Sequence, residues 1–366
     1  MDSFSTLDSF EHKTLLTEPF NLTYSYYLSP NFHSKTSVPT LVFCHGYPDD
    51  AHMWAGVVSH LTDLPCRMVL VDLLGLGGSS KPGSLKPADT SKYRWKQQAD
   101  SIIQILDHEA VGNDIIPIGH DWGSSTVQRL YLYHPHRCRG LCLISGAYSP
   151  PLDAPFDLET ANNETTKRFG YPQWEYWNFF NAPDAPKLMR DNLQRFLEVN
   201  NGTLPSPNPE EKGRDIWMRE MFCVPGAMRE YITQTGRYED FTVELKPYAQ
   251  TPEFRAMFID RLRRDGLEGA VNYYLALTHN HNLADEREYL ASKAARTIRV
   301  PVLYIGQTGD WVCRTDLMRE PREAGLLVGD VEERVVEAGH WCLYEKPEEI
   351  GGLIKDWVVR RFPAEG

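Results

Sequence analysis

Gly119-His120-Asp121-Trp122-Gly123 lies where an apolar, β-rich run, residues 114–119, meets a helical pattern over residues 122–133. This arrangement predicts a sharp turn from a strand into a helix, which strains the backbone and exposes the central side chain at the edge of a sheet. The flanking glycines suit such a turn, because the chain doubles back on itself there. An aspartate at the exposed position indicates a carboxylate that forms an ester with a substrate. The five residues are a weak signal alone, so the prediction depends on the sequence around them.

The surrounding sequence alternates between predicted strands and predicted helices. Near-continuous apolar runs are typical of strands that are buried on both faces of a parallel sheet. Strands are predicted at residues 20–28, 40–44, 67–72, 114–119 and 139–145, and a helix at 93–110. The spacing predicts βαβ units and an α/β fold on a mostly parallel, doubly wound sheet. Pro117 cannot donate to a ladder, so we expect an interruption there.

The composition of the chain changes in its middle part. Residues 147–296 are rich in Trp, Tyr, Phe, Asn and Pro and contain helical pieces but no strand-like run. Strand and helix patterns return afterwards, at residues 300–305, 332–336 and 347–361. We therefore expect one α/β core, formed by residues 1–146 and 297–366, which is interrupted by a helical cap over residues 147–296.

The net charge of −12 limits the partners of this chain, because an acidic protein is a poor ligand for nucleic acid or for an anionic membrane surface. No run of about 18 apolar residues is present, so we expect no membrane span. Residues 1–18 lack the regions of a secretory signal. The seven scattered cysteines contain no Cys-x-x-Cys pair, which favours reduced thiols in the cytoplasm. The sequence leaves the oligomeric state open.

A carboxylate nucleophile needs a base to release its ester and an acid to orient that base. Asp310 follows the predicted strand at 300–305, and His340 follows the last predicted strand, so both side chains are placed at the edge of the sheet. The order nucleophile, acid, histidine matches one of the known triad orders. Asp121, Asp310 and His340 are therefore the predicted catalytic triad.

Hydrolysis of the ester also needs donors for an oxyanion. His45-Gly46-Tyr47-Pro48 follows the predicted strand at 40–44 and can place the Tyr47 N–H beside the N–H of Trp122. We predict that these two amides form the oxyanion hole, within a segment shaped by His45, Gly46 and Pro48.

Two other patterns invite a cofactor or metal interpretation. In the loop Gly75–Ser80, Ser80 stands where the third glycine of Gly-x-Gly-x-x-Gly is required, so we expect a flexible loop beside the active site and no dinucleotide. His279 and His281 have no cysteine or carboxylate partner at a ligand spacing. We therefore expect neither a cofactor nor a metal.

The chain resembles the epoxide hydrolases of the α/β-hydrolase superfamily over nearly its whole length. Three segments carry the likeness: His-Gly-x-Pro at residues 45–48 with Trp54, Asp-x-x-Gly-x-Gly-x-Ser at 72–79, and Gly-His-Asp-Trp-Gly at 119–123. Haloalkane and haloacetate dehalogenases share these segments and also use an aspartate nucleophile. The resemblance implies an α/β-hydrolase fold with a helical cap and leaves the two chemistries open.

Two cap tyrosines distinguish the chemistries. Tyr176, in the segment that ends at Pro183, and Tyr274, in Asn272-Tyr273-Tyr274, look like the family's pair of hydroxyls that hold the epoxide oxygen. The resemblance implies that Asp121 opens a small epoxide and that His340 activates water to release a vicinal diol, without a cofactor. Tyr273 replaces the family's usual Trp and the cap is longer than is typical, which leaves the pocket shape open.

Two alternatives remain. The first is a hydrolytic dehalogenase that uses the same Asp-His-Asp triad, with the Trp122 indole as a donor to the departing halide. The second is a binding protein that has kept the fold, because a fold does not determine a function. Ser124 and Ser125 lie beyond the tip of the turn, which disfavours a serine esterase.

Overall fold

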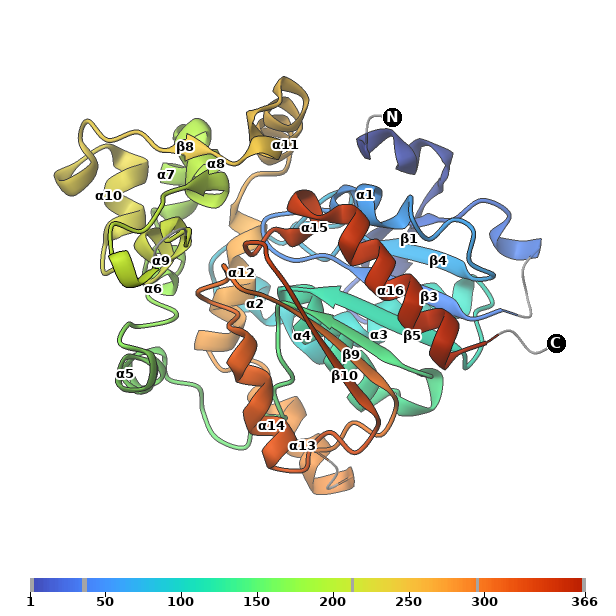
Figure 1. Cartoon of the computed structure of the whole chain (residues 1–366). Helices are drawn as coiled ribbons and strands as arrows, with labels where there is room; N and C mark the ends of the chain where they lie inside the picture. Colours follow the sequence, from blue (N-terminus) through green and yellow to red (C-terminus); the bar gives the residue numbers. More distant parts are fainter. Residues whose placement is uncertain (1–2, 35–37, 212–213, 294–295, 364–366) are drawn as a thin grey trace.

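The computed structural model describes residues 3–34, 38–211, 214–293 and 296–363. Its centre is an eight-stranded sheet in the order β1-β2-β4-β3-β5-β6-β9-β10 (Figure 1). β2 pairs antiparallel with β1 and β4, whereas all later neighbours are parallel, as the sequence predicts. The strands are β1 (Glu11–Thr17), β2 (Leu22–Leu28), β3 (Thr40–Cys44), β4 (Arg67–Val71), β5 (Ile115–His120), β6 (Leu141–Ile144), β9 (Val302–Gln307) and β10 (Val331–Val336).

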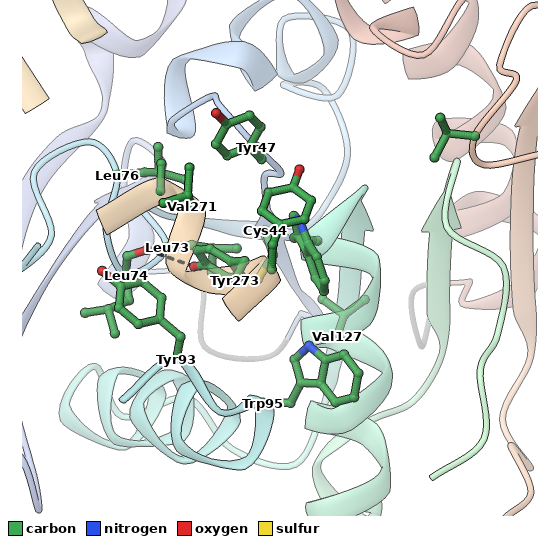
Figure 2. Packing of buried hydrophobic residues seen from close by; sticks show 14 of the residues in the cluster. Cys44, Tyr47, Leu73, Leu74, Leu76, Tyr93, Trp95, Val127, Val271 and Tyr273 are labelled. Carbon is green, nitrogen blue, oxygen red and sulfur yellow. Dashed lines mark hydrogen bonds between the residues drawn. The ribbon is translucent and has the colours of Figure 1, made fainter. Parts of the chain in front are cut away.

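Helices cover both faces of this sheet, which explains why its central strands are largely apolar. All five side chains of β3 are buried. Val42 and Cys44 belong to the apolar cluster that includes α3 and α4, part of which is drawn in Figure 2, whereas Leu41 and Phe43 belong to the cluster that includes α1 and α16. The helices of the core are α1 (Ala55–Val58), α2 (Pro87–Thr90), α3 (Trp95–His108), α4 (Trp122–Tyr133), α14 (Arg319–Glu323), α15 (Cys342–Glu345) and α16 (Pro347–Arg361).

The chain between β6 and β9 is mainly helical, and Figure 1 shows most of its helices on one side of the core. Two short strands, β7 (Gly202–Thr203) and β8 (Glu244–Leu245), pair antiparallel within it. Its helices are α5 (Leu158–Phe169), α6 (Tyr176–Phe180), α7 (Ala185–Asp191), α8 (Leu193–Asn201), α9 (Trp217–Phe222), α10 (Ala227–Thr233), α11 (Pro252–Asp265), α12 (Glu268–Thr278) and α13 (Leu283–Lys293). We call this part the helical insertion.

The structure differs from the sequence-based prediction at β1 and agrees with it at β5. β1 is absent from the predicted strands because its side chains are mostly exposed and its sequence lacks apolar alternation. β5 pairs with β3 through Pro117 but pairs with β6 only from Ile118 onward, so the ladder is interrupted on the β6 side.

All seven cysteines are free thiols. Within the described ranges, no helix has both the length and the apolar character that crossing a membrane requires.

Candidate active site

Asp121 stands at a strained turn between β5 and α4. Its backbone has φ 54° and ψ −122°, a conformation that residues other than glycine rarely adopt. A Cβ atom on Gly119 would lie 2.3 Å from the Gly123 carbonyl oxygen, and one on Gly123 would lie 2.0 Å from the Cys44 oxygen. Only glycine therefore fits at positions 119 and 123, two residues before and two residues after Asp121. The chain forms the sharp strand-to-helix turn that the sequence predicts.

The structure brings the three predicted triad residues together from the ends of β5, β9 and β10. His340 Nδ1 lies 2.6 Å from Asp310 Oδ2, and His340 Nε2 lies 3.5 Å from Asp121 Oδ2. The other oxygen of Asp310 accepts hydrogen bonds from the N–H groups of Val312 and Cys313, at 3.0 and 2.7 Å. These bonds fix the Asp310 carboxylate, which in turn orients the imidazole.

The charges of the triad support one another. Burial raises the pKa of Asp121, but the hydrogen bond and positive charge of His340 outweigh it, so the pKa lies below its ordinary value. Burial lowers the pKa of His340, but the charge of Asp310 and the hydrogen bonds to Asp121 and Asp310 hold it well above its ordinary value. An imidazolium between two carboxylates explains both shifts. In the resting site, Asp121 is ionised and His340 is protonated.

Two backbone amides face the Asp121 carboxylate. The Tyr47 N–H donates to Asp121 Oδ1 at 2.9 Å, and the Trp122 N–H also hydrogen-bonds this carboxylate. Gly46 permits the approach, because a Cβ there would lie 2.4 Å from Asp121 Cβ. The predicted oxyanion donors are thus in position, and the Tyr47–Pro48 peptide beside them is cis.

The His45 side chain contacts backbone groups of neighbouring segments and not the Asp121 carboxylate. Its Nε2 accepts the Leu73 N–H at 2.9 Å, and its Nδ1 lies 2.9 Å from the Gly46 oxygen. Both ring nitrogens are therefore engaged by backbone groups, and His45 supports the loop after β4.

Tyr176, the first residue of α6, and Tyr274, on α12, meet above the turn that carries Asp121. Their ring centroids are 5.7 Å apart, and the Tyr274 ring lies 5.2 Å from that of Trp122. Burial raises the pKa of both phenols well above 10, and the negative charge of Asp121 adds to the shift of each. Both hydroxyls therefore carry a proton at neutral pH and can donate hydrogen bonds.

Tyr273 points away from this pair. Its hydroxyl donates to the Leu74 oxygen at 2.9 Å and lies 2.8 Å from Gln98 Oε1, so it joins α12 to the core (Figure 2). The replacement of the family's usual Trp by Tyr273 therefore adds a contact between the insertion and the core.

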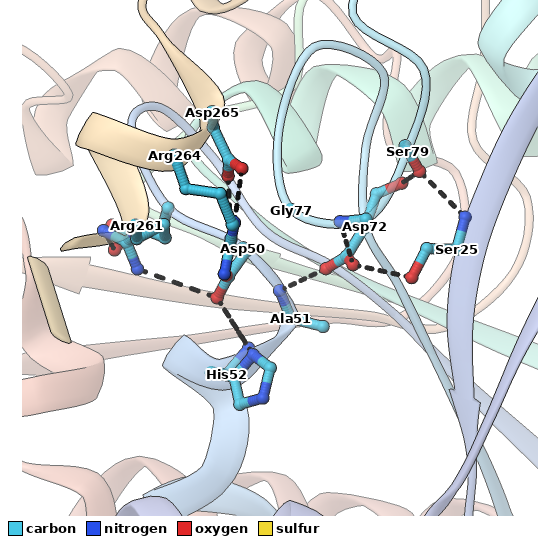
Figure 3. Close-up of polar contacts among 12 residues, drawn as sticks. Ser25, Asp50, Ala51, His52, Asp72, Gly77, Ser79, Arg261, Arg264 and Asp265 are labelled. Carbon is cyan, nitrogen blue, oxygen red and sulfur yellow. Dashed lines mark hydrogen bonds and ion pairs between the residues drawn. The ribbon is translucent and has the colours of Figure 1, made fainter.

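The Asp72 carboxylate anchors the loop that contains Gly75–Ser80. It accepts hydrogen bonds from the hydroxyl of Ser25 and from the N–H groups of Ala51 and Gly78, each at 2.8 Å (Figure 3). The sequence-based expectation of a flexible loop is therefore wrong, because a flexible segment lacks such buried bonds.

Asp121 and Tyr176 line one cavity of about 210 Å³. Three residues that follow Asp121 on one face of α4 also line it, namely Trp122, Ser125 and Arg129. The remaining walls are mostly apolar and aromatic, formed by Trp95, Gly146, Ser149, Leu152, Phe156, Trp174, Trp177, Leu277, Val312 and Cys313. Three other hollows, of about 220, 430 and 540 Å³, contain none of the predicted site residues. The cavity is thus suited to a small, largely apolar molecule.

Residues 39–347 match the family model described as alpha/beta hydrolase fold. The chain belongs to this family. An epoxide hydrolase of Neurospora crassa, srdG, is 26% identical over 361 residues, which cover 95% of each protein. The bifunctional epoxide hydrolase 2 of Rattus norvegicus is 22% identical over 337 residues, which cover 90% of this chain but only 53% of the rat protein. The crystal structure of epoxide hydrolase A from Mycobacterium thermoresistibile shares the fold, with a TM-score of 0.71, 23% identity and coverage of 95% of this chain and 98% of that one.

The sequence pattern missed two side chains in the cavity wall. Cys313 lies three residues after Asp310, in the turn closed by its own N–H bond to that carboxylate. Burial raises the pKa of the Cys313 thiol to about 12, so it stays protonated and does not compete with Asp121 as a nucleophile. Trp177 is buried, and its Nε1 has no hydrogen-bond partner within the described part of the chain. Only the spacing from Asp310 could have pointed to Cys313.

A buried ion pair that the sequence did not predict joins the helical insertion to the segment that follows Tyr47 and, through it, to the segment that follows His340. Arg261 Nη2 of α11 donates to Asp49 Oδ1 at 2.8 Å, beside the oxyanion segment. Asp49 also accepts hydrogen bonds from Trp341, which directly follows His340, and from Tyr344 of α15. The Arg261 guanidinium lies 3.6 Å from the carboxylate of Asp50, as Figure 3 shows. We call Arg261 and Asp49 the insertion clip.

Replacing Arg261 by Met is expected to lower the free energy of unfolding by about 3–5 kcal/mol, because Asp49 stays buried without its cation. Urea denaturation measures the change. Arg263→Met on the same helix is the matched control: its partner Asp260 and Arg263 itself are 69% and 64% exposed, so a loss of at most about 1 kcal/mol is expected. Equal losses in the two variants would contradict a stabilising role for the insertion clip.

Proposed function

We propose that this protein hydrolyses an epoxide to a vicinal diol through an ester on Asp121. The observation that carries the proposal is the pairing of two protonated phenols, Tyr176 and Tyr274, whose ring centroids lie 5.7 Å apart and which both feel the charge of Asp121. Tyr176 and Asp121 line the same small cavity. A carboxylate attacks a ring carbon only if the ring oxygen is stabilised as it leaves, and a pair of hydroxyl donors provides that stabilisation. The names of the relatives agree with this chemistry.

In the first step, Asp121 attacks a ring carbon of the epoxide and the carbon–oxygen bond breaks. Oδ1 is held by the Tyr47 amide, so Oδ2 is the attacking oxygen and Oδ1 becomes the ester carbonyl. The leaving oxygen is held by the two tyrosine hydroxyls. The ester removes the negative charge beside His340, so the imidazolium becomes more acidic, and its proton neutralises the new alkoxide.

In the second step, the neutral His340 takes a proton from water as the water attacks the carboxyl carbon of Asp121. The oxyanion forms on Oδ1, where the amides of Tyr47 and Trp122 hold it. As this intermediate collapses, the bond between the carboxyl carbon and Oδ2 breaks, and the proton that remains on the added water oxygen passes to the departing alkoxide, which leaves as the diol. Asp121 is then ionised and His340 is protonated again. The proton that His340 gave to the alkoxide is thus recovered from water, and the cycle closes.

A single-turnover experiment in ¹⁸O-labelled water tests this route. With enzyme in excess over styrene oxide, the diol is expected to carry no ¹⁸O, because its new oxygen comes from Asp121, and the label is expected on the Asp121 peptide. A labelled diol in the first turnover would show direct attack of water on the epoxide. Absence of any diol would overturn the proposed function itself.

A second candidate is supported by Trp177. Its unpartnered indole N–H and the Trp122 side chain both face the tyrosine pair, and indole N–H groups suit a departing halide. A dehalogenase that uses the same triad would release halide from a haloalkane and form no diol from styrene oxide. The paired phenols favour the epoxide.

The proposed reaction uses only the epoxide, water and residues of this chain. We place the enzyme in the cytoplasm, since all seven cysteines are free thiols, which a reducing compartment maintains.

A further inference from the structure

The thiol of Cys313 lies close to two members of the triad, Asp310 and His340. The proposed reaction uses the carboxylate and the imidazole but not the thiol. Asp310, Cys313 and His340 each offer one metal-binding atom, and these atoms lie within 4.8 Å of one another. The contact of Cys313 with Asp310 is made by the backbone N–H, which any residue at this position supplies. The thiol itself contacts His340 and helps to raise the pKa of the imidazole, but no bond to sulfur forms or breaks in the reaction proposed above.

We propose that Asp310, Cys313 and His340 form an inhibitory site for a thiophilic divalent cation such as Zn²⁺. Zn²⁺ is bound by sulfur, nitrogen and oxygen ligands at about 2.0–2.3 Å, which separates the atoms of a tetrahedral set by about 3.3–3.8 Å. The three donors, within 4.8 Å of one another, reach this spacing with shifts of about 1 Å. The cation would replace two protons, one on the His340 nitrogen that now contacts Asp310 and one on the Cys313 thiol, and both protons pass to the solvent.

Access and ion preference follow from the surroundings of these donors. Cys313 lines the same cavity as Asp121, so an ion that enters this cavity meets the thiol by the route of the substrate. A thiolate ligand favours Zn²⁺ and Cd²⁺, whereas Mg²⁺ and Ca²⁺ prefer sets of oxygen ligands. With the cation on Nδ1, His340 carries its remaining proton on Nε2, the nitrogen that faces Asp121, so it has no free lone pair with which to take a proton from water. The resulting loss of activity rests on the proposed function, but the binding does not.

Cadmium binding tests the site without reference to activity. The wild-type protein is expected to bind one Cd²⁺ per chain at Cys313, with the ultraviolet charge-transfer band of a cadmium–thiolate bond. Cys313→Ser, which keeps the size of the side chain, is expected to lose the band and to bind at least about 10-fold more weakly. Cys138→Ala removes another buried thiol and is expected to behave as the wild type. Cys313→Ala replaces the serine variant if circular dichroism shows that the latter is unfolded.

Inhibition of epoxide hydrolysis is the second readout. Zn²⁺ is expected to inhibit the wild type and Cys138→Ala, with recovery on addition of a chelator, while Mg²⁺ at the same concentration has no effect. The Cys313 variant is expected to need at least about 10-fold more Zn²⁺ for the same fractional loss. Equal sensitivity of the Cys313 variant and the wild type, or a wild type without the cadmium band, would overturn the proposal. A protein that shows the band but opens no epoxide would contradict the proposed function and leave the metal site standing.

Discussion

A His340→Gln variant that is incubated with an epoxide is expected to accumulate a covalent adduct on Asp121 with the mass of the intact substrate. Gln cannot take a proton from water, so hydrolysis of the ester slows by about 10²- to 10⁴-fold. The Tyr47 amide and the two phenols are unchanged, so the ester still forms. Ester hydrolysis thus becomes slow in the variant, and the intermediate persists. Peptide mass spectrometry after quenching identifies the modified residue.

The control for this experiment removes the nucleophile from the same background. His340→Gln combined with Asp121→Asn is expected to give no adduct, because an amide does not attack the epoxide carbon. An adduct on a peptide without Asp121 would assign the nucleophile to another residue. Cys313 is the informative case, because its side chain lines the same cavity.

The sequence could select three residues that the structure places side by side, because each of them depends on local signals. A strand end, a turn and a helix start lie within a few residues of Asp121, and strand ends precede Asp310 and His340 as closely. Parallel strands end at the same edge of a sheet. The strand pattern alone therefore predicts that Asp121 and His340 are neighbours, although they are 219 positions apart in the sequence. The fold class followed from the same pattern of buried strands.

Contacts between the insertion and the core left no such signal. Asp49 and Arg261 are 212 residues apart, and neither stands in a pattern that distinguishes a buried ion pair from two exposed charges. Tyr273 and Tyr274 show the same difficulty at short range. Adjacent helical residues point about 100° apart, so only the packing of α12 decides which hydroxyl joins the core and which faces Tyr176. Resemblance to a family, and not periodicity, selected Tyr274.

The double variant Tyr176→Phe/Tyr274→Phe is expected to lose epoxide opening almost completely. Removal of one donor to a developing oxyanion costs about 10²- to 10³-fold in rate, and the remaining phenol still serves in each single variant. In the double variant no hydroxyl is left, so the loss is expected to exceed that of either single variant. Because the phenols act on ester formation, the rate of adduct accumulation in the His340→Gln background is the quantity to measure.

Tyr273→Phe is the matched control, since it removes a hydroxyl from the neighbouring position of the same helix. Loss of its hydrogen bonds to the core is expected to cost about 1 kcal/mol of stability and to leave the rate of adduct formation unchanged. Equal rates in the double variant and the wild type would show that the leaving oxygen is stabilised elsewhere. The Trp122 and Trp177 indoles would then be the nearest remaining donors, and the halide chemistry would gain the support that the phenols now give to the epoxide.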